Sequence, residues 1–189
     1  YIYAKAEVSA LSLLPPVGER SDMRYVSGRA TDPNAGAPAA APAAGDPGIV
    51  GAPGLQVQGL PIVKPPYGSI TAIDMNTGEH LWTIPHGDMD AKAQEAFKSN
   101  KLLQGRTIDT NWGRRGHAAM AATSTLLLAT GQAANGQAQL FAIDKKTGKR
   151  VGQVATTRLG GYGLMTYMHQ GKQYIVVQLA NGLQAFALP

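Results

Sequence analysis

The side chains that could perform acid–base or metal chemistry are spread thinly along this chain of 189 residues. It has 12 carboxylates, four histidines and no cysteine. General acid–base catalysis needs a positioned carboxylate or histidine, and a metal site needs closely spaced ligands. Asp74, Glu79 and Asp144 fall at predicted hairpin turns and Asp88 at a predicted helix start, and none forms a pair or a Ca²⁺-binding loop. We therefore assign no catalytic acid and no metal ligand to this chain.

The histidines are dispersed in the same way. His80, His86 and His169 fall at turns or strand ends, and we expect them to be solvated. His117 belongs to a loop and carries no metal-ligand spacing with the others. The lack of cysteine excludes a disulfide framework and a cysteine-based metal site.

A hairpin motif occurs twice in the sequence, 70 residues apart. It indicates the elements that must position these side chains. Residues 72–78 read AIDMNTG and residues 142–148 read AIDKKTG. The Asp side chain can accept N–H groups of the turn, Thr adds a second local bond, and Gly takes a positive φ. Trp82 follows the first copy and should fill a gap between two sheets, donating its indole N–H to a backbone carbonyl; Gly152 stands at that position after the second copy. A repeated hairpin of this kind indicates β-propeller blades.

Alternating apolar residues predict strands on both sides of each motif, four of them in a row in the middle of the chain. We expect an all-β fold of about two and a half blades. The expected division is 1–14, a strand of an incomplete blade; 15–66, an insertion loop; 67–117, the rest of that blade and a connecting loop with a short helix beginning at Asp88; 118–157, a complete four-stranded blade; and 158–189, a last blade that lacks its outer strand.

The insertion differs in composition from the rest of the chain. Ten of the 12 prolines lie between Pro15 and Pro66, and residues 35–54 are almost entirely Ala, Pro and Gly. Such sequence buries little apolar surface, so we expect an extended surface loop without regular elements.

The overall composition narrows the class of protein. The net charge of +5 comes from scattered lysines and arginines, which is typical of a solvated surface and argues against nucleic-acid binding. No apolar run approaches the ~20 residues of a membrane-spanning helix. The first residues read as a strand and not as a signal peptide, as though the chain were cut from something longer.

The incomplete blades have a consequence for assembly. Sheets open at both ends expose unpaired backbone, and two and a half blades cannot close a ring of about four to eight. We therefore expect another polypeptide to carry the remaining blades, either a separate subunit or the N-terminal part of the same precursor. A self-standing small β-domain is excluded by the same argument.

Residues 60–189 resemble the C-terminal region of quinoprotein dehydrogenases, in the glucose-dehydrogenase-like branch that uses pyrroloquinoline quinone (PQQ). The resemblance rests on KPPYGSITAIDMNTGEHLW at 64–82, on MTY at 165–167 and on GKQYIVV at 171–177. It implies an eight-bladed propeller with PQQ and Ca²⁺ near the axis, an Asp base, and hydride transfer from a sugar, polyol or alcohol to the quinone. It also implies a cytochrome or membrane quinone as electron acceptor and a periplasmic location.

The resemblance places the family's Ca²⁺ ligands and catalytic Asp in blades outside this chain. Its cofactor-proximal positions, carried over to loops and inner strands here, select Lys64, Trp112, Arg115, His117, Thr166, Ala180 and Asn181. For Trp112, packing between blades is an equal alternative. The family's usual Gly-Gly-Trp is missing at 179–181, which puts that contact in doubt. A non-catalytic scaffold built from the same repeats stays open as the alternative, although the 64–68 and 165–167 motifs favour the enzyme.

Overall fold

The computed structural model describes residues 1–6, 8, 11–14, 26–29, 56–58, 60–106, 111–114 and 116–188. The chain divides into two compact units, one formed by Tyr1–Ala6 with Lys64–Pro189 and the other by Glu7–Val63. Nearly all described elements are strands paired antiparallel. The predicted all-β class is confirmed.

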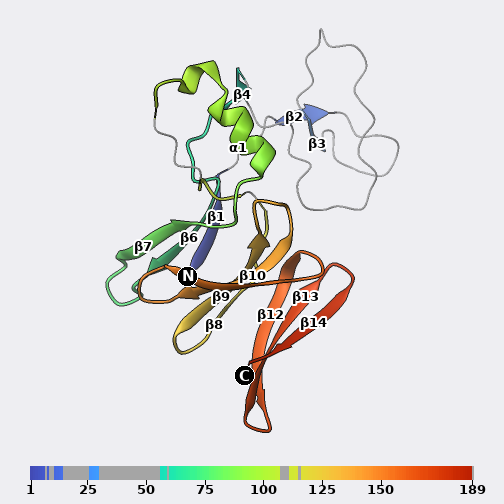
Figure 1. The fold of residues 1–189 in the computed structure, drawn as a ribbon. Coiled ribbons are helices and arrows are strands. Elements are labelled where there is room, and N and C mark those ends of the chain that lie inside the picture. Colours follow the sequence, from blue (N-terminus) through green and yellow to red (C-terminus); the bar gives the residue numbers. More distant parts are fainter. Residues whose placement is uncertain are drawn as a thin grey trace. The chain divides into compact units, whose positions relative to one another are not determined.

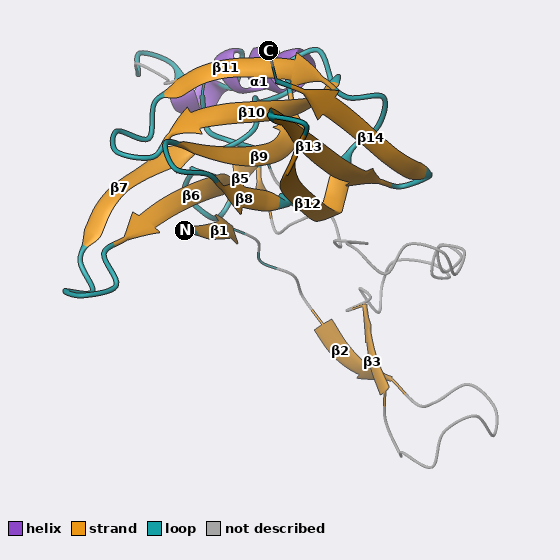
Figure 2. Cartoon of the chain, turned by 90° about the horizontal axis from the view of Figure 1, so that it is seen from below, coloured by secondary structure: helices purple, strands orange, loops and turns teal. Residues whose placement is uncertain are grey.

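Three sheets make up the first unit, and we number them in chain order (Figures 1 and 2). Sheet 1 has the order β1 (Ile2–Lys5), β6 (Gly68–Ile73), β7 (His80–Pro85). Sheet 2 has the order β11 (Arg150–Ala155), β10 (Ala138–Asp144), β9 (Leu126–Gln132), β8 (Met120–Ala122). Sheet 3 has the order β12 (Gly160–His169), β13 (Lys172–Leu179), β14 (Gly182–Ala187).

The two copies of the hairpin motif form the turns that their residues predict. Asp74 Oδ1 accepts the Asn76 N–H at 2.8 Å, and Asp144 Oδ1 accepts the N–H of Lys146 at 3.1 Å and of Thr147 at 2.8 Å. The Thr147 hydroxyl also donates to Asp144, and this bond is the main cause that lowers the pKa of the Asp144 carboxyl. Each turn closes on a glycine with positive φ, as tight hairpins require.

The core lies between the sheets, and β9 shows why its sequence is apolar at successive positions. Successive side chains of a strand point to opposite faces. Leu127 and Ala129 pack with Ile70 of sheet 1, whereas Leu128 packs with Ile175 and other residues of sheet 3. Because β9 is covered on both faces, it reads LLLAT and not as an alternating strand.

Trp82 fills the gap between sheets 1 and 2, as predicted. Its Nε1–H donates to the backbone carbonyl of Lys145 at 3.0 Å. A Cβ built on Gly148 would lie 2.8 Å from Trp82 Cδ2, so the indole sits directly on the glycine of the second hairpin.

The second unit holds two short hairpins among its described residues. They are β2 (Leu11–Leu14) with β3 (Val26–Arg29), and β4 (Gln56–Val57) with β5 (Leu60–Pro61). The prediction that 15–66 has no regular elements is therefore wrong for β3, β4 and β5. Each of these strands pairs with one hairpin partner. The average composition of the whole segment does not reveal such local pairing.

One predicted cap is also corrected. Helix α1 (Ala91–Lys98) is capped by Asp90 and not by Asp88, because Asp90 Oδ1 accepts the N–H groups of Lys92 and Ala93. Asp88 instead bonds to Arg150. A single 3-10 turn, Lys101–Leu103, follows the helix. Within the described residues, no helix has the length and apolar character to cross a membrane.

Candidate functional site at the loop end

The longer loops of the first unit meet at one end of the sheets, which we call the loop end. The Asp88 N–H donates to the Gln132 carbonyl at 2.8 Å and the Ala91 N–H to the Ala134 carbonyl at 3.2 Å. The Thr156 N–H donates to the Ala138 carbonyl at 2.9 Å. These bonds join the segment after β7, the β9–β10 turn and the loop between β11 and β12. The predicted site residues in the loops should therefore be sought here.

Trp112 belongs to an aromatic cluster and not to a free surface. Its ring lies 5.0 Å from Phe97 of α1 and 6.1 Å from Tyr67, both edge-to-face. The Tyr67 N–H donates to the Trp112 carbonyl at 2.7 Å. The ring therefore anchors the helix-bearing loop over the start of β6 by packing.

The two predicted basic residues precede β6 and β8 in the sequence. Lys64 is exposed just before β6, and Arg115 lies outside the described residues. The neighbouring Arg114 was not selected from the sequence, yet its Nη1 is buried and bonds to none of the described residues. Its backbone is fixed, since the Arg114 N–H donates to the His86 carbonyl at 2.8 Å.

The expectation that His86 is solvated is wrong. Its side chain is buried, its Nε2 lies 2.9 Å from the Thr130 carbonyl, and its ring packs edge-to-face on Tyr3 and Phe141. A carbonyl only accepts, so Nε2 carries the proton. Burial lowers the pKa of His86 from its ordinary value of 6.5 and outweighs the hydrogen bond to Thr130, which raises it. His86 therefore joins sheets 1 and 2 as a neutral side chain.

His117 is exposed and faces the start of β12, where its Cβ would lie 3.1 Å from a Cβ on Gly161. The loop that carries His117 is fixed by a hydrogen bond two residues further on, at Ala119. The Ala119 N–H donates to the Thr130 hydroxyl at 2.9 Å, and that hydroxyl donates to the Gly160 carbonyl. Thr130 thus positions the entries to both β8 and β12, a role that the sequence did not suggest.

The structure separates Thr166 from the other selected residues. β12 begins at the loop end with Gly160, and Thr166 follows six positions later, about 20 Å along an extended strand. There its hydroxyl accepts the Gln173 Nε2–H at 2.7 Å, close to the opposite turn. Thr166 therefore does not share a site with Ala180.

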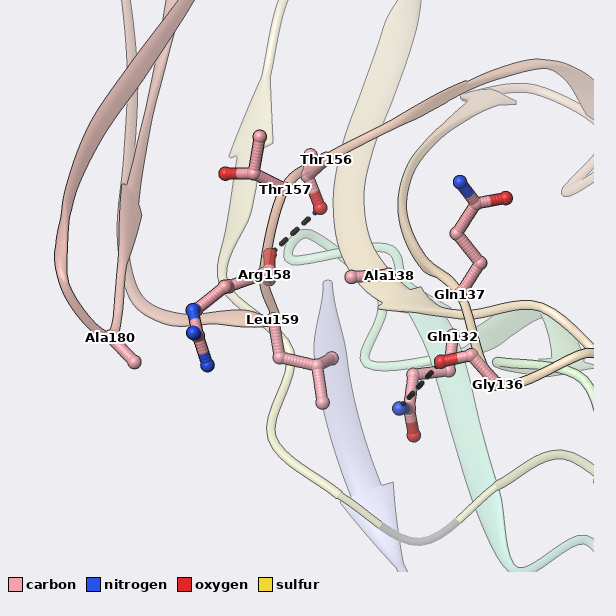
Figure 3. A pocket seen from close by; sticks show the side chains of 9 residues that line it. All are labelled: Gln132, Gly136, Gln137, Ala138, Thr156, Thr157, Arg158, Leu159 and Ala180. Atoms are coloured by element: carbon pink, nitrogen blue, oxygen red, sulfur yellow. Dashed lines mark hydrogen bonds between the residues drawn. The ribbon is translucent and has the colours of Figure 1, made fainter.

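Ala180 and the loop between β11 and β12 border an open pocket of about 570 Å³ at the loop end (Figure 3). The Thr156 hydroxyl donates to the Arg158 carbonyl at 2.8 Å and shapes the loop. Asn181 is exposed in the next turn position and does not line the pocket. The lining consists of Gln132, Gly136, Gln137, Ala138, Thr156, Thr157, Arg158, Leu159 and Ala180.

The lining of this pocket offers hydrogen-bonding groups and one positive charge. Arg158 is its one ionisable side chain, and it could pair with an anionic group. Among the described residues, no three His, Asp or Glu side chains converge to bind a metal ion. A planar quinone with Ca²⁺ would also need an aromatic surface and a base, and the lining of this pocket has neither, so this pocket does not make a PQQ site by itself.

Arg158 could have been found from the sequence. The loop before β8 was selected because it precedes the first strand of a blade, and residues 156–159 precede the first strand of the next one. His86 and Thr130 carry no comparable signal, since their roles depend on neighbours far away in the sequence.

Residues 3–175 match the family described as the glucose/ethanol/alcohol dehydrogenase β-propeller domain of PQQ enzymes. The chain belongs to this family. The resemblance seen in the sequence is thereby confirmed, and three blade-like sheets packed side by side agree with it.

Two curated relatives are the glycerol dehydrogenase large subunits of Gluconobacter thailandicus and Gluconobacter oxydans (strain 621H). Each is 32% identical over 128 residues, which is 67% of this chain and 16% of the relative. The chain thus spans about one sixth of the curated proteins that it matches. No solved structure matches it significantly.

Proposed function

We propose that this chain is part of a PQQ-dependent dehydrogenase that oxidises a hydroxyl group of a polyol, alcohol or sugar. The observation that carries the proposal is the family match over residues 3–175. Glycerol is the first substrate to test, because both relatives are named glycerol dehydrogenase large subunits.

In this proposal the chain contributes blades and loop-end surface, and the reacting groups lie elsewhere. The pocket offers Arg158 and backbone groups but no base, and three converging metal ligands are missing from the described part. PQQ, Ca²⁺ and the catalytic Asp would therefore be held mainly by the remaining blades of an eight-bladed propeller. A partner polypeptide carrying those blades, a cytochrome or membrane quinone as acceptor, and a periplasmic location complete the proposal.

The test is made on the native assembly that contains this chain. Denaturing mass spectrometry should release a species with the mass of PQQ, and the intact assembly should reduce an artificial dye acceptor when glycerol is added. Chelation of Ca²⁺ should abolish dye reduction, and Ca²⁺ with PQQ should restore it. An assembly that releases no quinone and oxidises neither glycerol, other polyols, alcohols nor sugars would contradict the proposal and favour the scaffold alternative.

A further inference from the structure

A basic segment begins at the last residue of α1. Residues 98–106 read KSNKLLQGR, with three cationic side chains and no carboxylate. Lys98, Lys101 and Arg106 are all exposed, and none forms an ion pair within the described part of the chain. Leu102, between them in the sequence, is 47% exposed. The basic segment therefore combines unpaired positive charge with one exposed apolar side chain.

Local hydrogen bonds hold the backbone of the basic segment. The Ser99 hydroxyl donates to the Glu95 carbonyl at 3.0 Å, and Asn100 Oδ1 accepts the Leu102 N–H at 2.9 Å. No residue of α1 or of the 3-10 turn is buried. Burial of apolar surface therefore contributes little to this order beyond the packing of Phe97. The order fixes the exposed charges before a partner binds, which lowers the entropy cost of binding.

The carboxylates of the same loop do not neutralise this charge. Residues 86–106 contain three carboxylates. Asp88 is paired with Arg150, and Asp90 accepts two N–H groups at the start of α1. Among these described residues, Glu95 is the carboxylate that remains to oppose the cations. The loop therefore presents a net positive surface to solvent.

The basic segment belongs to the loop end of the sheets. Phe97 of α1 packs on Trp112, one of the residues selected as cofactor-proximal. The Ala91 N–H ties the start of α1 to the Ala134 carbonyl in the β9–β10 turn, and this turn borders the pocket that Ala180 also lines. A protein docked on the basic segment is therefore at the end of the sheets that carries the loops predicted to approach the cofactor.

A protein surface fits the basic segment better than a membrane does. Helices that bind membranes bury a continuous apolar face in the lipid. The aromatic side chain of α1, Phe97, packs instead on Tyr67 and Trp112, which leaves Leu102 as the exposed large apolar residue. Three cations around a single leucine match a protein that presents carboxylates around a small apolar contact.

We infer that residues 98–106 form the docking surface for an acidic haem protein that accepts electrons. Its carboxylates would pair with Lys98, Lys101 and Arg106, and its apolar contact would cover Leu102. Oxidation of one hydroxyl group to a carbonyl releases two electrons and two protons. Two acceptor molecules therefore dock in turn, each takes one electron at its haem iron, and the protons pass to water. The inference names a docking face for the acceptor in the proposed function and rests on that function.

The salt dependence of electron transfer tests the inference on the native assembly. With its hydroxyl substrate as reductant, we compare an acidic c-type cytochrome, a basic c-type cytochrome and a small uncharged dye as acceptors. Raising the ionic strength from about 20 mM to about 200 mM should slow reduction of the acidic cytochrome about tenfold and change that of the dye less than about twofold, because salt screens the attraction between opposite charges.

Matched charge reversals locate the effect on the surface. Lys98→Glu with Lys101→Glu reverses two exposed charges of the basic segment. Lys146→Glu with Lys149→Glu reverses two exposed charges of the same spacing on the hairpin at the other end of sheet 2. At low ionic strength, we expect the first pair to slow the acidic cytochrome about tenfold and to speed the basic one, and the control pair to change either rate less than about threefold. A gain with the basic cytochrome cannot come from misfolding.

Three results would overturn the inference: equal effects of the two pairs, a rate for the acidic cytochrome that does not respond to salt, or no gain with the basic cytochrome. Binding to phosphatidylglycerol vesicles that Lys98→Glu with Lys101→Glu abolishes, with both cytochrome rates unchanged, would overturn it in favour of a membrane surface. Reduction of the dye by the wild type separates these outcomes from failure of the proposed function, since the dye needs no docking surface.

Discussion

The guanidinium of Arg150 on β11 donates to Asp88 Oδ1 at 2.9 Å, across the boundary between sheets 2 and 1. Its Cζ also lies 3.9 Å from the centre of the buried Phe141 ring. The two side chains are about one-quarter exposed, so water screens the pair only in part. This bridge ties the segment that leads into α1 to the middle sheet.

Replacing Arg150 should therefore lower stability more than an ordinary surface substitution does. Arg150→Met keeps a long apolar side chain but removes the guanidinium that pairs with Asp88 and lies over the Phe141 ring, and we expect a loss of about 1–2 kcal/mol. Chemical denaturation of the purified native assembly, wild type against variant, measures this difference. Arg158→Met is the matched control, because Arg158 is exposed, and it should change stability by less than about 0.5 kcal/mol. Equal losses in the two variants would contradict the role of the bridge.

The contact of Trp82 with Gly148 can be divided into its parts by substitution. Trp82→Phe keeps a ring but removes the bond to the Lys145 carbonyl, and we expect a loss of about 1 kcal/mol. Gly148→Ala should cost more than Gly171→Ala, because both have positive φ but only Gly148 faces the indole. Thermal unfolding of the three variants compares them. If Gly148→Ala and Gly171→Ala unfold at the same temperature, the indole does not require glycine there.

Thr130 offers a sharper test of how the loop end is held. Thr130→Val preserves shape but leaves the buried Ala119 N–H and the Gly160 carbonyl without their partner. We expect a loss of about 2–4 kcal/mol and faster amide exchange at Ala119. Thr130→Ser keeps the hydroxyl and should lose much less. Similar losses for serine and valine would show that the methyl group matters and the hydrogen bonds do not.

The buried His86 makes stability depend on pH. Because its pKa in the folded protein is below 6.5, the unfolded chain takes up a proton first as the pH falls. The contribution of neutral His86 is complete above about pH 6.5 and is lost as the pH drops towards the lower folded pKa. Melting temperatures between pH 8 and pH 5 should fall more steeply for the wild type than for His86→Gln, which cannot titrate. Parallel curves would rule out His86 as the cause.

The sequence predicted those parts of the fold that depend on local patterns. The strands, both hairpin turns and the docking of Trp82 follow from alternation, from the Asp-x-x-Thr-Gly turn and from one large aromatic residue. The candidate site was predicted less well. The sequence left open whether Trp112 packs or contacts a cofactor, and Thr166 lies near the opposite end of its strand, because the surroundings of a side chain are decided by neighbours distant in sequence. The burial of His86, between Tyr3 and Phe141, is another result of such neighbours.

The close approach of Gly113 to Gly68 has a consequence for how the protein could be remodelled. A Cβ on Gly113 would collide with the Gly68 carbonyl, and the next residue donates its N–H to the His86 carbonyl at 2.8 Å. The chain therefore departs after His86 and comes back at Arg114 to within one hydrogen bond of where it left. Because the ends of this excursion lie so close together, its length beyond the Asp88–Arg150 bridge can change while β7 and β8 keep their places.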